Sequence, residues 1–307
     1  MGQLIGSQLI YGVAKSHLRS YPQRFFYLCL LLSICLAFPA HAEPDYSKTP
    51  IFFVHGHGMS ASCWNDLISY LRECGYPKKY LRAIQLYPNT GSNIDAAEEQ
   101  IAPAIEEFLR EINESIKRQF TMRLKTKVDL ISHSMGALSA RWYTVKVRPD
   151  RVRMWLSLGG ANHGTDVLCA WSDPGARDLC PAYAKNPKES LVQYLLNGEP
   201  HEGDIDETPY GLGKDSPGVD SIPPDNTRSI LYISIRTSPD KWIKPEHSPI
   251  LDGAGGIKIQ FPESIRAKKT SLGNILMTNG VGHDAMLSNE DTMKLVRIIL
   301  DLQHMTH

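Results

Sequence analysis

The sequence predicts an α/β protein built on a doubly wound, mostly parallel sheet with an inserted cap segment. Continuous apolar runs such as Ile51–Val54 and Val152–Leu158 are typical of strands buried on both faces. Segments with apolar residues at helical spacing follow such runs, for example between residues 93 and 120. This regular alternation of strand and helix places successive strands parallel, with helices on both faces of the sheet.

The predicted elements run from residue 51 to residue 303. Strands are expected at 51–54, 81–86, 128–132, 152–158, 230–235 and 275–278, and helices at 64–71, 93–120, 137–147 and 291–303. Asn93 is the expected N-cap of the second helix. At residues 162–228 the alternation fails, and this stretch is rich in Pro, Gly and Asp. Irregular insertions of this length are usually functional, so we expect one domain, 43–307, with an embedded cap.

Residues 1–42 are predicted to be a signal peptide. Three basic residues and no acidic residue precede the apolar run Phe25–Phe38, which is shorter than a membrane span of about 20 residues. Small residues at Ala40 and Ala42 then favour cleavage after Ala42. The protein is therefore expected to be secreted or periplasmic, with an uncleaved membrane anchor as the alternative.

The charge balance limits the classes of partner. The chain has 33 basic and 33 acidic residues, a formal net charge of zero, and no run of Lys and Arg. This argues against a nucleic-acid partner. It also provides no field that would steer an anionic substrate, which favours a neutral one.

Four cysteines follow residue 42, and an even number in an exported protein points to disulfides. Cys63 and Cys74 flank a predicted helix that would separate them by roughly 16 Å. Disulfide Cα atoms lie within about 7 Å of each other. Cys169 and Cys180 lie in a Gly- and Pro-containing segment that can loop back, so we expect the disulfide Cys169–Cys180. Cys63 and Cys74 are then free thiols, or pair only if the helix is broken.

Ser134 is the expected nucleophile. The strand Val128–Ser132 runs into a tight turn and then a helix, and Ser132 and Gly136 are small. A sharp bend of this kind needs small neighbours two residues on either side, and it lifts the hydroxyl above the sheet. It also places the amide of Met135, at a helix N-terminus, beside a developing oxyanion. A serine that merely caps a helix is the alternative interpretation.

Two later segments supply an acid and a base. Asp240 follows the strand at 230–235, at the sheet edge where a carboxylate can orient a histidine. Asp252, in a Gly-containing loop, is the rival acid. His283 lies in a Gly-rich loop after the last strand and can reach back as the general base. The chain order Ser134, Asp240, His283 is that of α/β hydrolases.

From about residue 50 to 305 the chain resembles minimal bacterial lipases and the related class 2 lipase/esterase group. The matching stretches are His55–Gly58, Ser132-His133-Ser134-Met135-Gly136, Leu158–Asn162, Tyr232–Asp240, Leu251–Ala254 and Gly280–His283. Ser132 replaces the first Gly of the Gly-x-Ser-x-Gly elbow. The insertions at 162–228 and about 255–274 have no counterpart in the minimal lipases.

The resemblance implies an α/β-hydrolase fold in which His57 provides the second oxyanion amide. With the predicted signal peptide, it implies a secreted carboxylic ester hydrolase of the triacylglycerol lipase or carboxylesterase type. The substrate would be a hydrophobic ester, hydrolysed through an acyl-enzyme on Ser134 without cofactor or metal. A metal pair at His55 and His57 is the weaker interpretation, because no further ligand cluster lies nearby in the sequence. Contact with a lipid interface is left open.

Two other functions are kept as alternatives. One is an extracellular polyester (polyhydroxyalkanoate) depolymerase, which exposed aromatic surface around the tryptophans would favour; the tryptophans in question are Trp142, Trp155, Trp171 and Trp242. The other is a non-catalytic hydrolase-fold binding protein, which the complete Ser, Asp and His set argues against.

Overall fold

The computed structural model describes residues 42–117, 123–180, 190–197, 230–251, 259–271 and 273–302. The predicted signal peptide, apart from Ala42, lies outside these residues, as do Asp252 and most of the second half of the 162–228 insertion. Within the described ranges, no helix combines the length and apolar character needed to cross a membrane.

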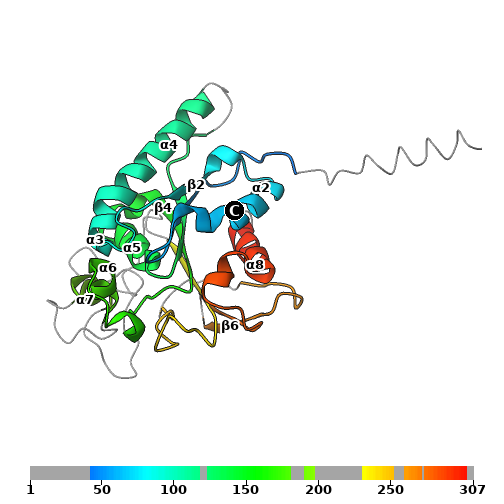
Figure 1. Ribbon diagram of the computed structural model, residues 1–307. Helices are drawn as coiled ribbons and strands as arrows, with labels where there is room; N and C mark the ends of the chain where they lie inside the picture. The colour runs from blue at the N-terminus through cyan, green and yellow to red at the C-terminus, as the bar shows by residue number, and fades with distance from the viewer. Residues whose placement is uncertain are drawn as a thin grey trace, which may run out of the picture. The chain divides into compact units, whose positions relative to one another are not determined.

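One mixed sheet organises the described residues, and its seven strands follow the order β2-β1-β3-β4-β5-β7-β6 (Figure 1). The strands are β1 (Ile51–Val54), β2 (Leu81–Ile84), β3 (Val128–His133), β4 (Val152–Leu158), β5 (Leu231–Arg236), β6 (Ala267–Ser271) and β7 (Asn274–Met277). All neighbouring strands pair in parallel except β6, which is antiparallel to β7. The expected doubly wound, mostly parallel sheet is confirmed.

Strand β6 lies in the second insertion, where no strand is predicted from the sequence. Its sequence is Ala-Lys-Lys-Thr-Ser, which lacks the apolar run of the central strands. The physical reason is its place at the sheet edge, where one side of the strand has no neighbour to bury it. An edge strand of this kind therefore carries no continuous apolar run in its sequence.

Helices cover both faces of the sheet. Figure 1 shows α3 (Asn93–Asp95), α4 (Ala102–Lys117) and α5 (Gly136–Trp142) on one side, with α2 (Asn65–Glu73) and α8 (Glu290–Asp301) on the other. The other helical segments are η1 (Ala61–Trp64), η2 (Lys78–Tyr80), η3 (Ala96–Ile101), η4 (Tyr143–Val147), η5 (Pro149–Arg151), η6 (Asp166–Leu168), α6 (Pro174–Leu179), α7 (Leu191–Asn197) and η8 (Asp284–Leu287).

Two hydrophobic clusters, one on each face, explain the continuous apolar strands. Phe52 and Val54 pack into the cluster that contains α4 and α5, whereas Ile51 and Phe53 pack into the cluster of α2 and α8. Successive side chains of a strand point to opposite faces, so a strand buried on both faces is apolar at every position.

The predicted N-cap at Asn93 is wrong by one residue. The Ser92 side chain accepts from the Asp95 amide, and Ser92 is the cap of α3. Asn93 is instead fully buried, where it donates to Asp178 and accepts from Ser139. Its amide side chain therefore joins α5 to the 162–228 insertion.

The strand order creates a crevice at one end of the sheet. The chain leaves β1 for β2 on one side and returns through α4 to β3 on the other side of β1. Where connections diverge in this way, a crevice opens beyond the carboxyl ends of the strands. The loop after β1 and the turn at Ser134 after β3 both lie at this point.

Candidate active site

Ser134 is held in a strained backbone conformation at the end of β3. Its φ of 53° makes it the only non-glycine residue with positive φ in the described part of the chain. Such a conformation costs on the order of 1–3 kcal/mol and persists at functional sites where the surroundings impose it. Here the Ser134 amide donates to the carbonyl of Leu158, and its carbonyl accepts from the amides of Ala137 and Ala161.

Close packing around this turn explains its small residues. A Cβ on Gly136 would lie 2.4 Å from the carbonyl oxygen of His55 and 2.8 Å from that of Val54. These are backbone atoms that cannot move aside. Ser132, in the position of the first Gly of the usual motif, is fully buried, and its hydroxyl donates to the carbonyl of Leu156. A hydroxymethyl group is thus accommodated on that side.

The loop after β1, residues 55–59 (the oxyanion loop), passes directly beside the nucleophile. A Cβ on Gly56 would meet the Cβ of Ser134 at 2.8 Å. The loop is anchored to residue 89 at two points, since the Gly58 amide donates to the Asn89 carbonyl and Asn89 Nδ2 donates to the Met59 carbonyl. The expected oxyanion residues His57 and Met135 thus flank Ser134 from two different loops.

Asp240 and His283 are joined by a buried hydrogen bond. His283 Nδ1 lies 2.8 Å from Asp240 Oδ2, and both side chains are at most 3% exposed. Asp240 Oδ1 accepts from the amides of Trp242 and Ile243 at 2.8 and 3.1 Å. The carboxylate is therefore fixed in orientation, with one oxygen aimed at the imidazole. Asp252, the rival acid, falls outside the described residues.

The second ring nitrogen of His283 is available as a base. His283 Nε2 is buried and has no hydrogen-bond partner among the described residues, and His283 lines the same cavity as Ser134. A closed Ser134–His283 hydrogen bond is absent from the described contacts. Catalytic hydrogen bonds of this kind often tighten only when substrate binds.

A second histidine packs beneath the base. The rings of His133 and His283 are 4.6 Å apart between centroids, and His133 Nε2 lies 3.2 Å from the His283 carbonyl oxygen. Complete burial, with a smaller contribution from His283, holds the pKa of His133 well below its usual value. His133 is therefore neutral and places no charge beside the base.

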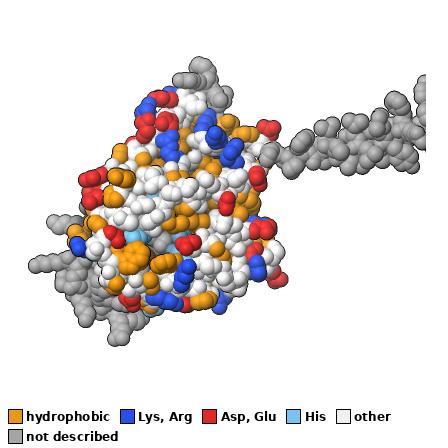
Figure 2. All heavy atoms as spheres, viewed as in Figure 1, with side chains coloured by type: hydrophobic (Ala, Val, Ile, Leu, Met, Phe, Trp, Pro, Cys, Tyr) orange, Lys and Arg blue, Asp and Glu red, His pale blue; other side chains and the backbone are white. Residues whose placement is uncertain are grey.

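The cavity at Ser134 has a volume of about 280 Å³. Its lining includes Met59 of the oxyanion loop, and Trp242 and Ile243 of the loop that carries Asp240 (residues 237–244, the acid loop). Four residues of the insertion also line it, which are Thr165, Leu168, Trp171 and Leu179. These four residues lie in the first part of the insertion, residues 162–180, which we call the strap. On the viewed face in Figure 2, histidine side chains reach the surface among hydrophobic ones.

The strap contains the predicted disulfide, because Cys169 and Cys180 are bonded to each other. Cys63 and Cys74 are free thiols, the alternative that the intervening helix favours. Hydrogen bonds tie the strap to the acid loop, since Thr165 Oγ1 donates to the Trp242 carbonyl and the Asp166 amide donates to the Lys244 carbonyl.

The histidines of the oxyanion loop do not form a metal pair. Both His55 ring nitrogens are occupied, Nδ1 by the Gly56 carbonyl and Nε2 by the Leu86 amide. His57 Nε2 lies 2.8 Å from Asp173 Oδ1. One group within the described ranges, His133, His283 and Asp284, brings ligand atoms within 4.8 Å of one another. Its two histidine rings lie 4.6 Å apart between centroids and are tilted by 49°, and His283 Nδ1 is already bound to Asp240.

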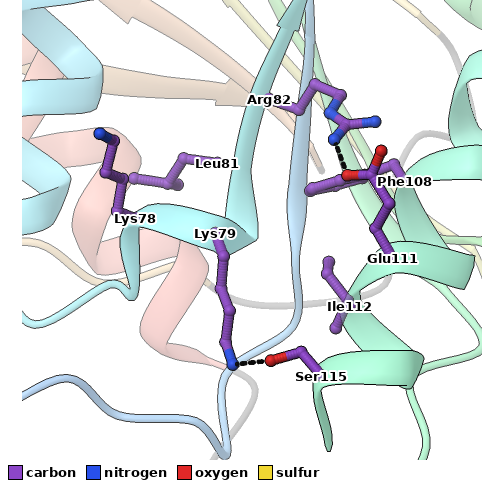
Figure 3. A pocket seen from close by; sticks show the side chains of 8 residues that line it. All are labelled: Lys78, Lys79, Leu81, Arg82, Phe108, Glu111, Ile112 and Ser115. Carbon is purple, nitrogen blue, oxygen red and sulfur yellow. Dashed lines mark hydrogen bonds and ion pairs between the residues drawn. The ribbon is translucent and has the colours of Figure 1, made fainter.

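A larger cavity of about 440 Å³ lies away from this chemistry, between β2 and α4 (Figure 3). Figure 2 shows Lys and Arg side chains gathered in this region. The polar groups in the cavity bind one another: Lys79 Nζ donates to Ser115 Oγ at 2.6 Å, and Arg82 pairs with Glu111. Ser115 thus faces a donor, whereas Ser134 shares its cavity with an unoccupied imidazole nitrogen. Ser134 is therefore the stronger candidate for the functional site.

This sheet topology is that of the α/β-hydrolase fold, with a strained serine after β3 and a buried Asp–His pair on later loops. Residues 48–186 match the family described as lipase (class 2), which confirms the resemblance expected from the sequence. This match supports the expectation of a hydrolase of the lipase/esterase type.

Several solved structures are similar to this chain. A mature lipase of Bacillus licheniformis is 24% identical over 45% of this chain and 56% of its own, with a TM-score of 0.35. The chain thus spans little more than half of that lipase. The metagenome-derived lipolytic enzymes LipS and LipT give 15% identity over 86% of this chain and 98% of theirs, with a TM-score of 0.44. A gene product of Listeria innocua is 13% identical over 83% of this chain and 94% of its own, with a TM-score of 0.42.

Sequence reasoning did not identify two groups that contact the site residues. One is His133, which the elbow motif treats as a variable position. The other is Asp173, whose place before Pro174 is typical of a helix N-cap, a role it does fulfil toward Ala176. Its second contact, with His57, joins residues 116 positions apart and leaves no local signal.

Proposed function

We propose that this protein is a secreted serine esterase or lipase that hydrolyses carboxylic esters of hydrophobic acyl chains through an acyl-enzyme on Ser134. The observation that carries the proposal is the buried Asp240–His283 hydrogen bond on the cavity that Ser134 lines. This pair leaves His283 Nε2 free to accept a proton, and the strained turn presents the serine hydroxyl to the same space.

In the proposed cycle, His283 Nε2 takes the proton of Ser134 as Oγ bonds to the ester carbonyl carbon. The carbonyl oxygen becomes an oxyanion held by the amides of His57 and Met135, each contributing roughly 3 kcal/mol. His283 then protonates the leaving alkoxide as its bond to carbon breaks. A water molecule repeats the sequence on the acyl-enzyme, and Asp240 stabilises the imidazolium in both halves.

The cavity favours an apolar acyl chain of short to medium length. Leu168, Trp171, Leu179 and Ile243 present apolar side chains to it. Its volume of about 280 Å³ is at or below the lower limit of typical ligand pockets, about 300–1,000 Å³. The strap residues in the cavity lining support the cap predicted from the sequence. Replacing Leu168 with Ala should move the preference toward longer esters, and an unchanged chain-length profile would remove the strap from specificity.

The direct test is ester hydrolysis by purified wild type and Ser134→Ala. The variant should keep the fold and lose about 10⁴-fold or more in kcat. Ser115→Ala is the matched control, since that serine lines the other cavity, and it should keep full activity. A fluorophosphonate should label wild type at Ser134. Activity that survives in Ser134→Ala, or unlabelled wild type, would refute the proposal and favour a binding protein.

A polyester depolymerase is the second candidate, and the position of one tryptophan favours it. Trp171 is 47% exposed at the cavity, where it could contact a solid surface. Trp142 and Trp155 are core residues, so extended aromatic surface around them is lacking. Release of soluble acids from a polyhydroxybutyrate film, compared with hydrolysis of p-nitrophenyl butyrate, separates the two candidates.

Export is also proposed. The Cys169–Cys180 disulfide supports it, because structural disulfides persist mainly in oxidising compartments. N-terminal sequencing of the mature protein should begin at Glu43, and a full-length chain retained in the membrane fraction would favour the anchor instead.

A further inference from the structure

The first turn of helix α6, in the strap, contacts the side chains of both residues expected to donate oxyanion amides. Asp173 Oδ1 lies 2.8 Å from His57 Nε2. A Cβ on Gly175 would lie 2.6 Å from Met135 Sδ, so this glycine lets the helix approach Met135 closely. The two contacts reach the two loops that flank Ser134.

His57 is held by the strap on two sides. Asp173 binds its Nε2, and the Trp171 ring meets its ring edge-on, with 5.4 Å between centroids. The His57 side chain is only 10% exposed. The imidazole, and the backbone to which it is attached, therefore cannot turn without breaking contacts with the strap.

Asp173 is itself a fixed and ionised group. Although partial burial opposes ionisation, hydrogen bonds from the Ala176 amide and from His57 hold the pKa of Asp173 below its usual value. The same oxygen, Oδ1, accepts both bonds, since it lies 2.9 Å from the Ala176 nitrogen. The carboxylate thus caps α6 and binds His57 in the same orientation.

The segment after β2 supports both partners. The amide of Gly175 donates to the Thr90 carbonyl at 2.9 Å, and the amide of Gly58 donates to the Asn89 carbonyl at 3.0 Å. The Asn93 amide also donates to Asp178 near the end of α6. The oxyanion loop and α6 therefore both bind the segment 89–93, in addition to contacting each other.

We propose that Asp173 is a positioning residue that, through His57, holds the oxyanion loop in the geometry needed to stabilise the transition state. This inference rests on the proposed esterase function. It makes the strap part of the catalytic framework as well as a wall of the acyl cavity. An oxyanion donor acts only where charge develops, so misplacing it should lower kcat and leave substrate binding nearly unchanged.

The test separates the contact with His57 from the helix cap. Asp173→Ser keeps a capping hydroxyl for Ala176 but is too short to reach His57. Asp173→Asn keeps Oδ1, the atom that accepts both hydrogen bonds. His57→Ala removes the imidazole and keeps the amide. Asp166→Ser, an exposed strap position outside the cavity lining, is the matched control.

The measurements are kcat and KM on p-nitrophenyl butyrate and the Ki of phenylboronic acid, which forms a tetrahedral adduct on serine. Removing one oxyanion donor costs about 10²–10³-fold in kcat, so displacing one should cost on the order of 10-fold. We expect this loss in Asp173→Ser and in His57→Ala, and no larger loss in the double variant. KM should stay within about twofold, Ki should rise with the loss of kcat, and Asp173→Asn should recover most activity.

Four outcomes would overturn the inference: wild-type kcat in Asp173→Ser, a loss confined to KM, multiplicative losses in the double variant, or Asp173→Asn as impaired as Asp173→Ser. Urea unfolding shows whether Asp173→Ser is folded. If it is not, the kcat of His57→Ala alone tests the inference, because that variant leaves the helix cap intact. The proposed function is tested separately. Ester hydrolysis that depends on Ser134 together with an unaffected Asp173→Ser refutes only this inference.

Discussion

Replacing Asp240 with Asn should disable the base through its tautomer, and the hydrogen bonds dictate how. Asp240 Oδ1 accepts two backbone amides, so only an oxygen can occupy that position. The Asn side chain must therefore place its NH₂ group where Oδ2 now faces His283 Nδ1. Two donors cannot face each other, so Nδ1 gives up its proton and Nε2 carries it instead. Nε2 can then no longer accept the proton of Ser134.

The expected loss is large because the wrong tautomer removes base catalysis altogether. An amide in place of a triad carboxylate costs on the order of 10⁴-fold in kcat, which is about 5.4 kcal/mol of activation free energy. The assay is kcat on p-nitrophenyl butyrate, with urea unfolding to show that Asp240→Asn is folded. Asp252→Asn is the comparison, and we expect it to remain within a few-fold of wild type. An Asp240→Asn enzyme within about 10-fold of wild type would refute the reasoning, and the reverse ranking would assign the acid to Asp252.

Two further predictions concern stability. Reduction of Cys169–Cys180 should loosen the strap before the core melts, because closing a loop of this length stabilises it by roughly 3 kcal/mol. Activity should then fall at a reductant concentration that leaves the thermal unfolding of the core unchanged. Loss of activity and of core stability at the same reductant concentration would contradict this prediction. Burial lowers the pKa of His133 and of His55. As pH falls below about 6.5, the unfolded chain binds protons that the folded protein does not, so stability should drop by up to about 1.4 kcal/mol per pH unit for each histidine. Urea midpoints at pH 7.5 and 5.5 measure this drop, and His133→Gln should roughly halve it; an unaltered pH dependence in that variant would exclude His133 as a source.

Much of the fold could be predicted because its signals are local. Ile51–Val54 and Val152–Leu158 are strands with the predicted bounds, since burial on both faces requires an apolar residue at each position. The turn at Ser134 was also recognisable, because a sharply bent backbone permits only small residues at 132 and 136. The edge strand β6 was not, because an edge position imposes no such pattern.

The sequence by itself determined the alternation of buried strands and helices along the chain, the residue types at the turn and the chain order of Ser134, Asp240 and His283. Only the tertiary structure brought Asp240 and His283 to 2.8 Å and showed that Asp173 binds His57. Local conformation depends on near neighbours, so it leaves a pattern in consecutive residues. Contacts between residues 43 or 116 positions apart depend on how the loops pack at the end of the sheet, and no run of consecutive residues records that packing.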